Sequence, residues 1–212
     1  MERHRPDHLL PPRGAKIPAG QDKIRITLSA PSQPSADPCS LDLIGRATVA
    51  GRELTHAAIP ADEMEQAFAW RHLVAQDVWM VRLLATGNAQ QPPVRAVENT
   101  LKLWWSGDRT SFTVPIPARQ RNGIKLALNE APDGVVIESC TPVPTGLAVV
   151  IRVHADKAKP GLKGNLILEA YRETGQQQPQ QPNRPRNRQR LALLPAIPFE
   201  VVAGPSTPGA FF

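Results

Sequence analysis

Cysteine is scarce in this sequence, whose 212 residues contain only Cys39 and Cys140. Two cysteines far apart cannot build a zinc site of the usual spacing without further ligands. A disulfide between them requires a fold that brings their Cα atoms within about 7 Å, which a sequence does not show. We interpret both as small unpaired core residues and leave their pairing open.

Aromatic residues and long apolar runs are also rare. Aromatics make up 5% of the chain, and no run approaches the roughly 18 apolar residues of a membrane-spanning helix. The opening MERHRPDHLLPPRG is charged and broken by proline, unlike a signal peptide. With 41% hydrophobic and 21% charged residues, the composition is typical of a globular chain.

The positive charge is concentrated in two segments. The net charge is +6, of which residues 1–20 contribute +2 and residues 175–190 contribute +4. The second segment has no aromatic residue for stacking on bases, so we predict a flexible basic loop and no specific nucleic-acid binding, with a weak polyanion contact as the alternative. The arginines of this loop are Arg184, Arg186, Arg188 and Arg190.

Proline, in contrast, is abundant. The chain has 23 prolines, against about 11 at average usage, which leaves little room for long helices. Apolar residues alternate with polar ones in short segments separated by Pro/Gly turns, as in half-buried strands. We therefore predict an all-β protein with an antiparallel β-sandwich of the immunoglobulin-like or jelly-roll type. The expected strands lie in 24–28, 41–49, 101–105, 112–116, 124–128, 135–137, 147–153, 164–171 and 190–202.

The pattern divides the chain into five segments. We predict a disordered tail over 1–15, a partial β-sandwich unit over 16–58, a short helical connector over 59–69, a complete sandwich over 70–203 and a disordered tail over 204–212. The helical prediction rests on a proline followed by acidic residues, with apolar residues spaced by three and four. The first unit has too few strands to close a sandwich, so we expect its front half to be missing, with docking onto the second unit as the alternative.

The sequence contains no recognisable catalytic or metal-binding pattern. No G-x-S-x-G motif is present, and Ser106, Ser111 and Ser139 lie in ordinary strand or turn patterns. Asp108 and Asp133 lie in turns without a second acid at the spacing of a calcium loop. We therefore predict no enzyme activity, no metal and no cofactor. The histidines, interpreted as surface or packing residues, are His4, His8, His56, His72 and His154.

Trp104 and Trp105 form the most suggestive aromatic pair. Neighbouring residues of a strand point to opposite faces, so one ring is expected in the core and the other outside. The outward ring is either a ligand-stacking platform or a cover for the sheet edge or the neighbouring unit. The platform would make the chain a carbohydrate-binding module.

Four segments resemble the C-terminal region of large exported proteins of planctomycete-type bacteria, which carry pre-peptidase C-terminal and immunoglobulin-like modules. They are Gly45–Leu54, Ile59–Val74, Ala155–Ala170 and Leu194–Val202, in that order within roughly 16–203. The resemblance implies a non-catalytic accessory module located extracellularly, in the periplasm or at the cell surface. Its expected partners are other modules of the same larger protein or cell-surface components. The resemblance implies no site residues, and the upstream modules and leader of that family are not found in this chain.

Taken as a whole, the sequence predicts a structural or interaction module from the C-terminal end of a larger exported protein. Carbohydrate binding through Trp104 or Trp105 is the alternative. A small hydrolase is the third hypothesis, and it lacks a recognisable pair of nucleophile and base.

Overall fold

The computed structural model describes residues 12–29, 37–66, 70–82, 100–174 and 187–204. The chain forms two compact units. The described part of unit 1 lies between residues 37 and 82, and the described part of unit 2 combines residues 12–29 with residues from 100 to 204. Unit 1 is therefore inserted into the sequence of unit 2.

Unit 2 is built from strands. Its described residues hold nine strands and one four-residue helix, α1, which is too short to cross a membrane. The elements are β7 (Leu101–Trp104), β8 (Thr110–Pro115), α1 (Ala118–Arg121), β9 (Ile124–Leu128), β10 (Val135–Val143), β11 (Gly146–Val153), β12 (Lys163–Leu166), β13 (Leu168–Thr174), β14 (Asn187–Leu193) and β15 (Ile197–Val202).

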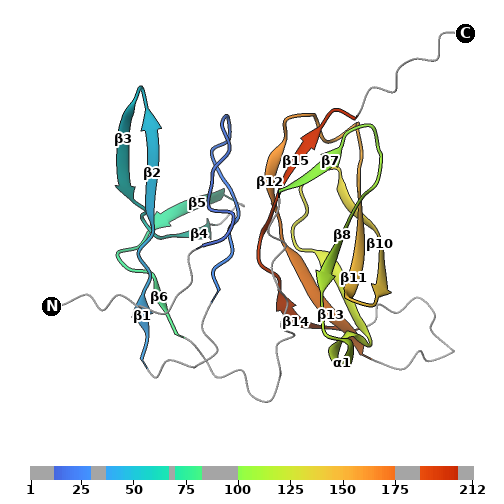
Figure 1. The fold of residues 1–212 in the computed structure, drawn as a ribbon. Helices are drawn as coiled ribbons and strands as arrows, with labels where there is room; N and C mark the ends of the chain where they lie inside the picture. The colour runs from blue at the N-terminus through green and yellow to red at the C-terminus, as the bar shows by residue number, and fades with distance from the viewer. Residues whose placement is uncertain (1–11, 30–36, 67–69, 83–99, 175–186, 205–212) are drawn as a thin grey trace, which may run out of the picture. The chain divides into compact units, whose positions relative to one another are not determined.

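The strands of unit 2 form two layers (Figure 1). One layer is the antiparallel sheet β10–β11–β8. The other consists of the sheets β12–β15–β7 and β14–β13–β9, which continue into one another because Ile167 alone separates β12 from β13. The pairing of β15 with β7 is parallel, and the other strand pairs are antiparallel. The predicted all-β, sandwich-like fold is confirmed, and its immunoglobulin-like or jelly-roll type stays a prediction.

The core between these layers is formed by alternate side chains along the strands. Every second side chain of β11 is buried, and the same holds along β15, because successive strand residues point to opposite faces. The side chains with no more than 2% exposure from these two strands are Leu147, Val149, Ile151, Val153, Ile197, Phe199 and Val201.

Residues 12–29, here called the strap, lie against this sandwich without joining a sheet. Their one ladder contact is an isolated bridge between Arg13 and Thr27. Asn165 of β12 donates its side-chain amide to the carbonyls of Gly14, at 2.9 Å, and Arg25, at 2.7 Å. The hydroxyl of Thr27 accepts the backbone N–H of Ala196 at 2.8 Å. The strap is thus held mainly by contacts of side chains with backbone groups.

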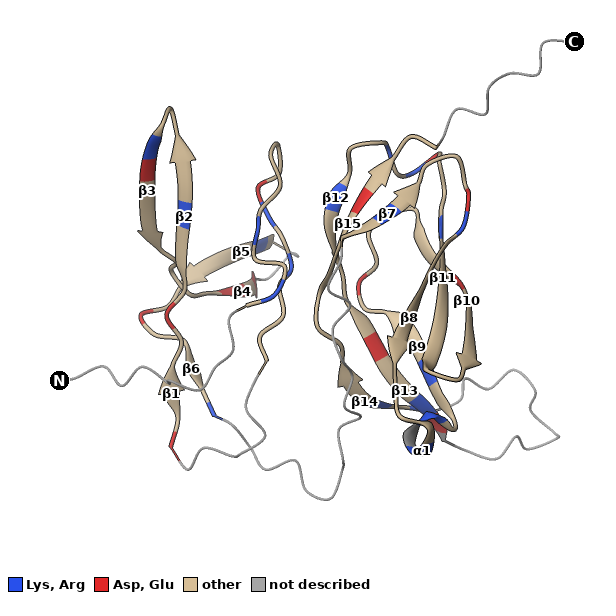
Figure 2. Cartoon of the chain, viewed as in Figure 1, with Lys and Arg blue, Asp and Glu red and all other residues tan. Residues whose placement is uncertain are grey.

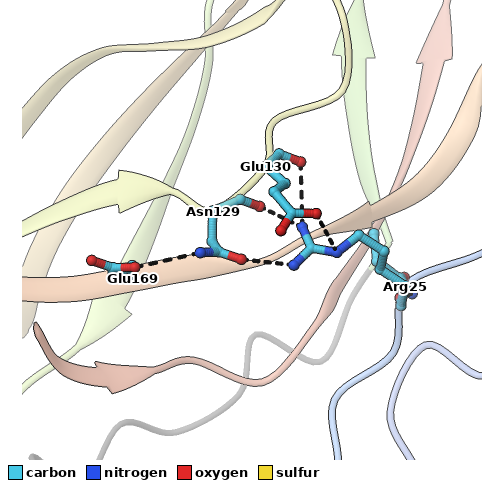
Figure 3. Close-up of polar contacts among 5 residues, drawn as sticks. Arg25, Asn129, Glu130 and Glu169 are labelled. Carbon is cyan, nitrogen blue, oxygen red and sulfur yellow. Dashed lines mark hydrogen bonds and ion pairs between the residues drawn. The ribbon is translucent and has the colours of Figure 1, made fainter. Parts of the chain in front are cut away.

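Arg25 makes the densest of these contacts (Figure 3). Its guanidinium donates to the carbonyl oxygen of Asn129 at 2.6 Å and to the side-chain Oδ1 of the same residue at 2.7 Å. It also forms an ion pair with Glu130 at 3.4 Å. The amide of Asn129 donates in turn to Glu169 at 3.4 Å. This network ties the strap to the turn after β9.

The strap corrects two sequence predictions. Ile24–Leu28 forms no strand, although its apolar residues are half-buried as the alternation suggested. Arg13 and Gly14 are bound rather than part of a disordered tail. The predicted grouping of 16–58 is wrong for residues 16–29, because their hydrogen bonds are made with unit 2. The remainder of the two predicted tails, 1–11 and 205–212, lies outside the described residues.

Unit 1 consists of paired short strands. They are β1 (Cys39–Ser40), β2 (Ile44–Val49), β3 (Arg52–Ala57), β4 (Ala61–Gln66), β5 (Trp70–Ala75) and β6 (Met80–Val81). The pairs β2–β3, β4–β5 and β1–β6 are all antiparallel and two-stranded, and we call them ribbons. The β2–β3 turn has positive φ at both Ala50, 49°, and Gly51, 76°, as tight two-residue hairpin turns require.

The predicted helical connector over 59–69 is wrong where the structure describes it, because residues 61–66 form β4. The helical pattern covered little more than one turn, which is too short to be stable by itself, whereas β5 supplies a partner strand that contains Trp70 and Val74, residue types common in strands. Arg71 of β5 also lies across from the acids of β4, at 3.9 Å from Glu63 and 3.8 Å from Glu65. Cross-strand pairing therefore outweighs local helix preference. Residues 67–69 lie outside the described residues.

The predicted sandwich boundaries also need correction. The second unit was expected to begin at residue 70, but residues 70–82 belong to unit 1, and β7 is the first strand of unit 2. The basic loop was expected over 175–190, but β14 begins at Asn187.

Candidate interaction surface

Unit 1 exposes its hydrophobic residues. Every buried hydrophobic residue of the described chain belongs to unit 2, whereas ten of the fourteen exposed large hydrophobic residues belong to unit 1. Trp70 and Leu73 of β5 and Ile59 are each 74% exposed. The other seven are Ile44, Val49, Leu54, Met64, Val78, Trp79 and Met80.

Backbone hydrogen bonds extend the ladder of two ribbons at their bases. Ala58 donates to Leu43 at the base of the β2–β3 ribbon, and Gln76 donates to Pro60 at the base of the β4–β5 ribbon, each at 2.8 Å. The three ribbons extend in different directions (Figure 1). Because no described ribbon has a third strand, apolar side chains on both faces of the ribbons remain open to solvent.

The β4–β5 ribbon has two unlike faces. Residues directly opposite each other share a face, so Met64 lies beside His72 on one face while Glu63 and Leu73 share the other. The acidic positions of β4 and the basic position of β5 are visible in Figure 2. The face with Met64 also carries Trp70, so it presents two large apolar side chains without an ion pair among the described contacts.

Comparison with protein-family models, curated proteins and solved structures finds no match to this chain.

Trp104 and Trp105, the predicted stacking pair, lie at the end of β7. Leu103 is fully buried, so the alternation points Trp104 to the outer face of the sheet, where it is partly buried. Trp105 lies beyond the strand, is 38% exposed, and donates its indole N–H to the Ala155 carbonyl at 3.3 Å. The expectation that one ring enters the core is wrong, because the strand ends before Trp105 can follow Leu103 inward.

The four arginines of the predicted basic loop are divided by the start of β14. Arg184 and Arg186 lie outside the described residues. Arg188 stacks on the ring of Tyr171, with its guanidinium carbon 4.7 Å from the ring centroid, and Arg190 lies 3.9 Å from Glu169. These two arginines therefore belong to an edge strand, where charged side chains discourage unwanted pairing with other strands.

The residues considered for catalysis or metal binding are dispersed. His56 and His72 lie on different ribbons, His4 and His8 are outside the described residues, and His154 is exposed after β11. Ser106 donates to Asp108 at 2.7 Å within one turn, and Asp133 is exposed. Within the described residues, no three His, Cys, Asp or Glu side chains gather as metal ligands would.

Sequence reasoning missed the unit 1 surface. The apolar residues of β5 suggest a core strand, and the sequence pattern alone does not reveal whether a second sheet covers them. The available signal was the number of strands, since a unit too small to close a sandwich leaves apolar residues uncovered.

The two cysteines are both free. Burial raises the pKa of the Cys140 thiol, and a hydrogen bond from the Leu126 backbone offsets this only in part. A raised pKa lowers the thiolate fraction at a given pH, and the thiolate is the reactive form. In a Cys39→Ser variant at pH 8, we expect iodoacetamide to alkylate Cys140 several-fold more slowly in the folded chain than in urea. Equal rates in the two states would contradict this account.

Proposed function

We propose that this chain is a non-catalytic interaction module of a larger exported or cell-surface protein, in which unit 2 is a rigid base and unit 1 contacts another protein. The observation that carries the proposal is the location of the exposed hydrophobic residues, most of which lie on unit 1. Folded units usually bury their large apolar side chains, and unit 1 buries none among its described residues, so these side chains are available to a partner.

Energetics support this proposal. Isolated two-stranded ribbons are marginal in water, because three or more strands with a covered apolar face are needed for independent stability. Covering a fully exposed Leu or comparable side chain contributes about 1.5–3 kcal/mol. Trp70 and Leu73, each 74% exposed, therefore have most of that contribution still to gain. A partner that covers β5 would stabilise unit 1 and bind at the same time.

The resemblance of Gly45–Leu54 and Ile59–Val74 to the tail of exported planctomycete-type proteins supports the same proposal. Both segments contain ribbon strands of unit 1: the first covers most of β2 and part of β3, and the second covers β4 and most of β5. The proposed partners are accordingly other modules of the same larger protein or components of the cell surface. Carbohydrate stacking receives less support, because Trp104 is partly buried and Trp105 is only 38% exposed.

Site-specific photo-crosslinking in the source cells tests the proposal. A benzophenone amino acid replaces Trp70 in one variant and Leu193, an exposed residue of β14, in a matched control. We expect discrete adducts of higher mass from position 70 and none from position 193. Adducts that are absent at position 70, or equally abundant at both positions, would remove the support for unit 1 as the contact surface. Retention on insoluble polysaccharide that Trp104→Ala or Trp105→Ala abolishes would favour the carbohydrate-binding alternative instead.

A further inference from the structure

We propose that two copies of the chain associate through the free edge of β5, which pairs antiparallel with the β5 edge of the second copy about a two-fold axis. This inference rests on the proposed function, because it names a second copy as the partner of the unit 1 surface. β5 pairs on one side with β4 and has no other strand partner among the described residues. The dimer would contain a four-stranded sheet in the order β4, β5, β5, β4.

The ladder of the β4–β5 ribbon determines which backbone groups of β5 face outward. Gln76 donates its N–H to the carbonyl of Pro60 at 2.8 Å, so this is a hydrogen-bonded pair. Hydrogen-bonded and non-hydrogen-bonded pairs alternate along an antiparallel ladder. The N–H and C=O groups that point away from β4 are therefore those of Arg71, Leu73 and Ala75.

Two-fold symmetry limits the register. Directly opposite residues of two paired strands share a face of the sheet. The two-fold axis must therefore pass beside one residue of β5, which lies opposite the same residue of the second copy. With Leu73 at the centre, three hydrogen-bonded pairs form, because Leu73 meets Leu73 and Arg71 meets Ala75 twice. With His72 at the centre, only two such pairs form. The Leu73-centred register uses every outward donor and acceptor of β5, so we assign that register.

Charge distinguishes the β5 edge from the edges of β2 and β4. The bond from Ala58 to Leu43 fixes the same alternation in the β2–β3 ribbon. If each strand paired with its own copy through its outward backbone groups, the residue on the two-fold axis would be Arg46 for β2, Thr55 for β3 and Glu63 for β4. Self-pairing of β2 or β4 would place like charges directly opposite each other, which is destabilising. Self-pairing of β3 would place Thr55 opposite Thr55, whereas self-pairing of β5 places Leu73 opposite Leu73.

β5 itself is apolar and its one cation is balanced. Arg71 is held near Glu63 and Glu65 of the same ribbon, as Figure 2 shows by the red of β4 beside the blue of β5. Trp70 and Leu73 are each 74% exposed, and β5 contains neither proline nor glycine. Proteins usually protect edge strands with lysine, proline, bulges or a covering element. β5 has no lysine, proline or bulge, and its one charged residue, Arg71, is paired with acids of its own ribbon, so β5 is suited to pair with a second β5.

Disulfide trapping tests the register. In a chain carrying Cys39→Ser and Cys140→Ser, Leu73→Cys places one thiol at the proposed two-fold axis. Opposite Cα atoms of a hydrogen-bonded pair lie about 5.5 Å apart, within the range that a disulfide spans. We expect mild oxidation to convert most of this variant into a covalent dimer, while Thr55→Cys, on the equivalent edge of β3, stays monomeric. Equal cross-linking of the two variants would overturn the proposal.

Sedimentation equilibrium of the full chain tests the association without cysteines. We expect the unmodified chain to dimerise reversibly and Leu73→Glu to weaken the dimer by about tenfold or more, because two carboxylates would face each other. Thr55→Glu adds the same charge to β3 and should leave the dimer unchanged. A monomeric unmodified chain overturns the dimer, and adducts of position 70 with a different protein would then still support the proposed function. Absence of both association and adducts would contradict both.

Discussion

A protein in which a short Gly/Ser linker replaces residues 30–99 should fold cooperatively and retain the stability of unit 2. Every buried hydrophobic residue of the described chain lies in unit 2, and the strap hydrogen bonds are made within that unit as well. Removing unit 1 therefore deletes no part of the described core. We expect a single thermal transition, within a few degrees of the transition of unit 2 in the full chain.

The linker can be short because the two chain ends lie near neighbouring positions of the sandwich. Thr27 contacts Ala196, and Leu101 lies opposite Phe199 in the β15–β7 ladder. Three residues of extended chain separate Ala196 from Phe199, about 10 Å, and adjacent strands lie about 4.8 Å apart. A linker of about eight flexible residues has an average span of roughly 15 Å, which is sufficient.

Two control proteins define the outcome. A fragment of residues 37–82 should show no cooperative transition by itself, because it has no buried hydrophobic residue among those described. The linked protein without residues 1–29 should be less stable than the linked protein with them, because the strap contacts are lost. An unfolded linked protein would show that unit 1 contributes to the core of unit 2, contrary to the fold described above.

Local pattern predicted much of unit 2. The segment Ile124–Leu128 was expected as a strand and forms β9, and 147–153 was expected as a strand and forms nearly all of β11. In both segments every second residue is a large apolar one and the segment ends at a turn, and the buried residues are those on the expected face. In these segments, local preference and tertiary packing favour the same structure, so the sequence was sufficient.

The strap and β4 were not predictable for the opposite reason. Arg25 contacts Asn129, 104 residues further along the chain, and no local pattern encodes a contact at that separation. In β4, Glu63 and Glu65 favour a helix start locally, but Arg71 lies across the ladder from them. The candidate surface could not be located for a related reason, because the exposure of Leu73 depends on whether another sheet covers it, and no described sheet of unit 1 does. Non-local partners decide all three cases.

Unit 1 is joined to unit 2 at two points of the sequence. Both ends of its sequence continue into unit 2, one through the strap and one through β7. The contacts of Arg25 and Asn165 hold the end of the strap from which the chain continues to unit 1.

Gly14→Ala should lower the free energy of unfolding of unit 2 by about 2–3 kcal/mol, because it combines backbone strain with loss of hydrogen bonds. Gly14 has a φ of 69°, and a Cβ atom there would lie 2.1 Å from the Asn165 amide nitrogen. That nitrogen donates to the carbonyls of both Gly14 and Arg25. The added methyl group therefore displaces the side chain that holds the strap at two points.

Gly20→Ala is the matched control for this effect. Gly20 also has a positive φ, 79°, but a Cβ atom there would meet nothing within 4 Å. Its substitution should cost only the backbone strain, about 1–2 kcal/mol. Urea denaturation of both variants, made in the linked protein, gives the difference between them, and that difference measures the steric conflict with Asn165.

A double-mutant cycle with Asn165→Ala separates the conflict from general loosening of the strap. Asn165→Ala alone should be destabilising, because it leaves the carbonyls of Gly14 and Arg25 without their donor. In that background the methyl group of Gly14→Ala has no amide to displace, so its cost should fall to that of Gly20→Ala. Two results would mean that Asn165 does not hold the strap. One is that the changes in free energy of unfolding for Gly14→Ala and Asn165→Ala are strictly additive, and the other is that Gly14→Ala costs no more than Gly20→Ala.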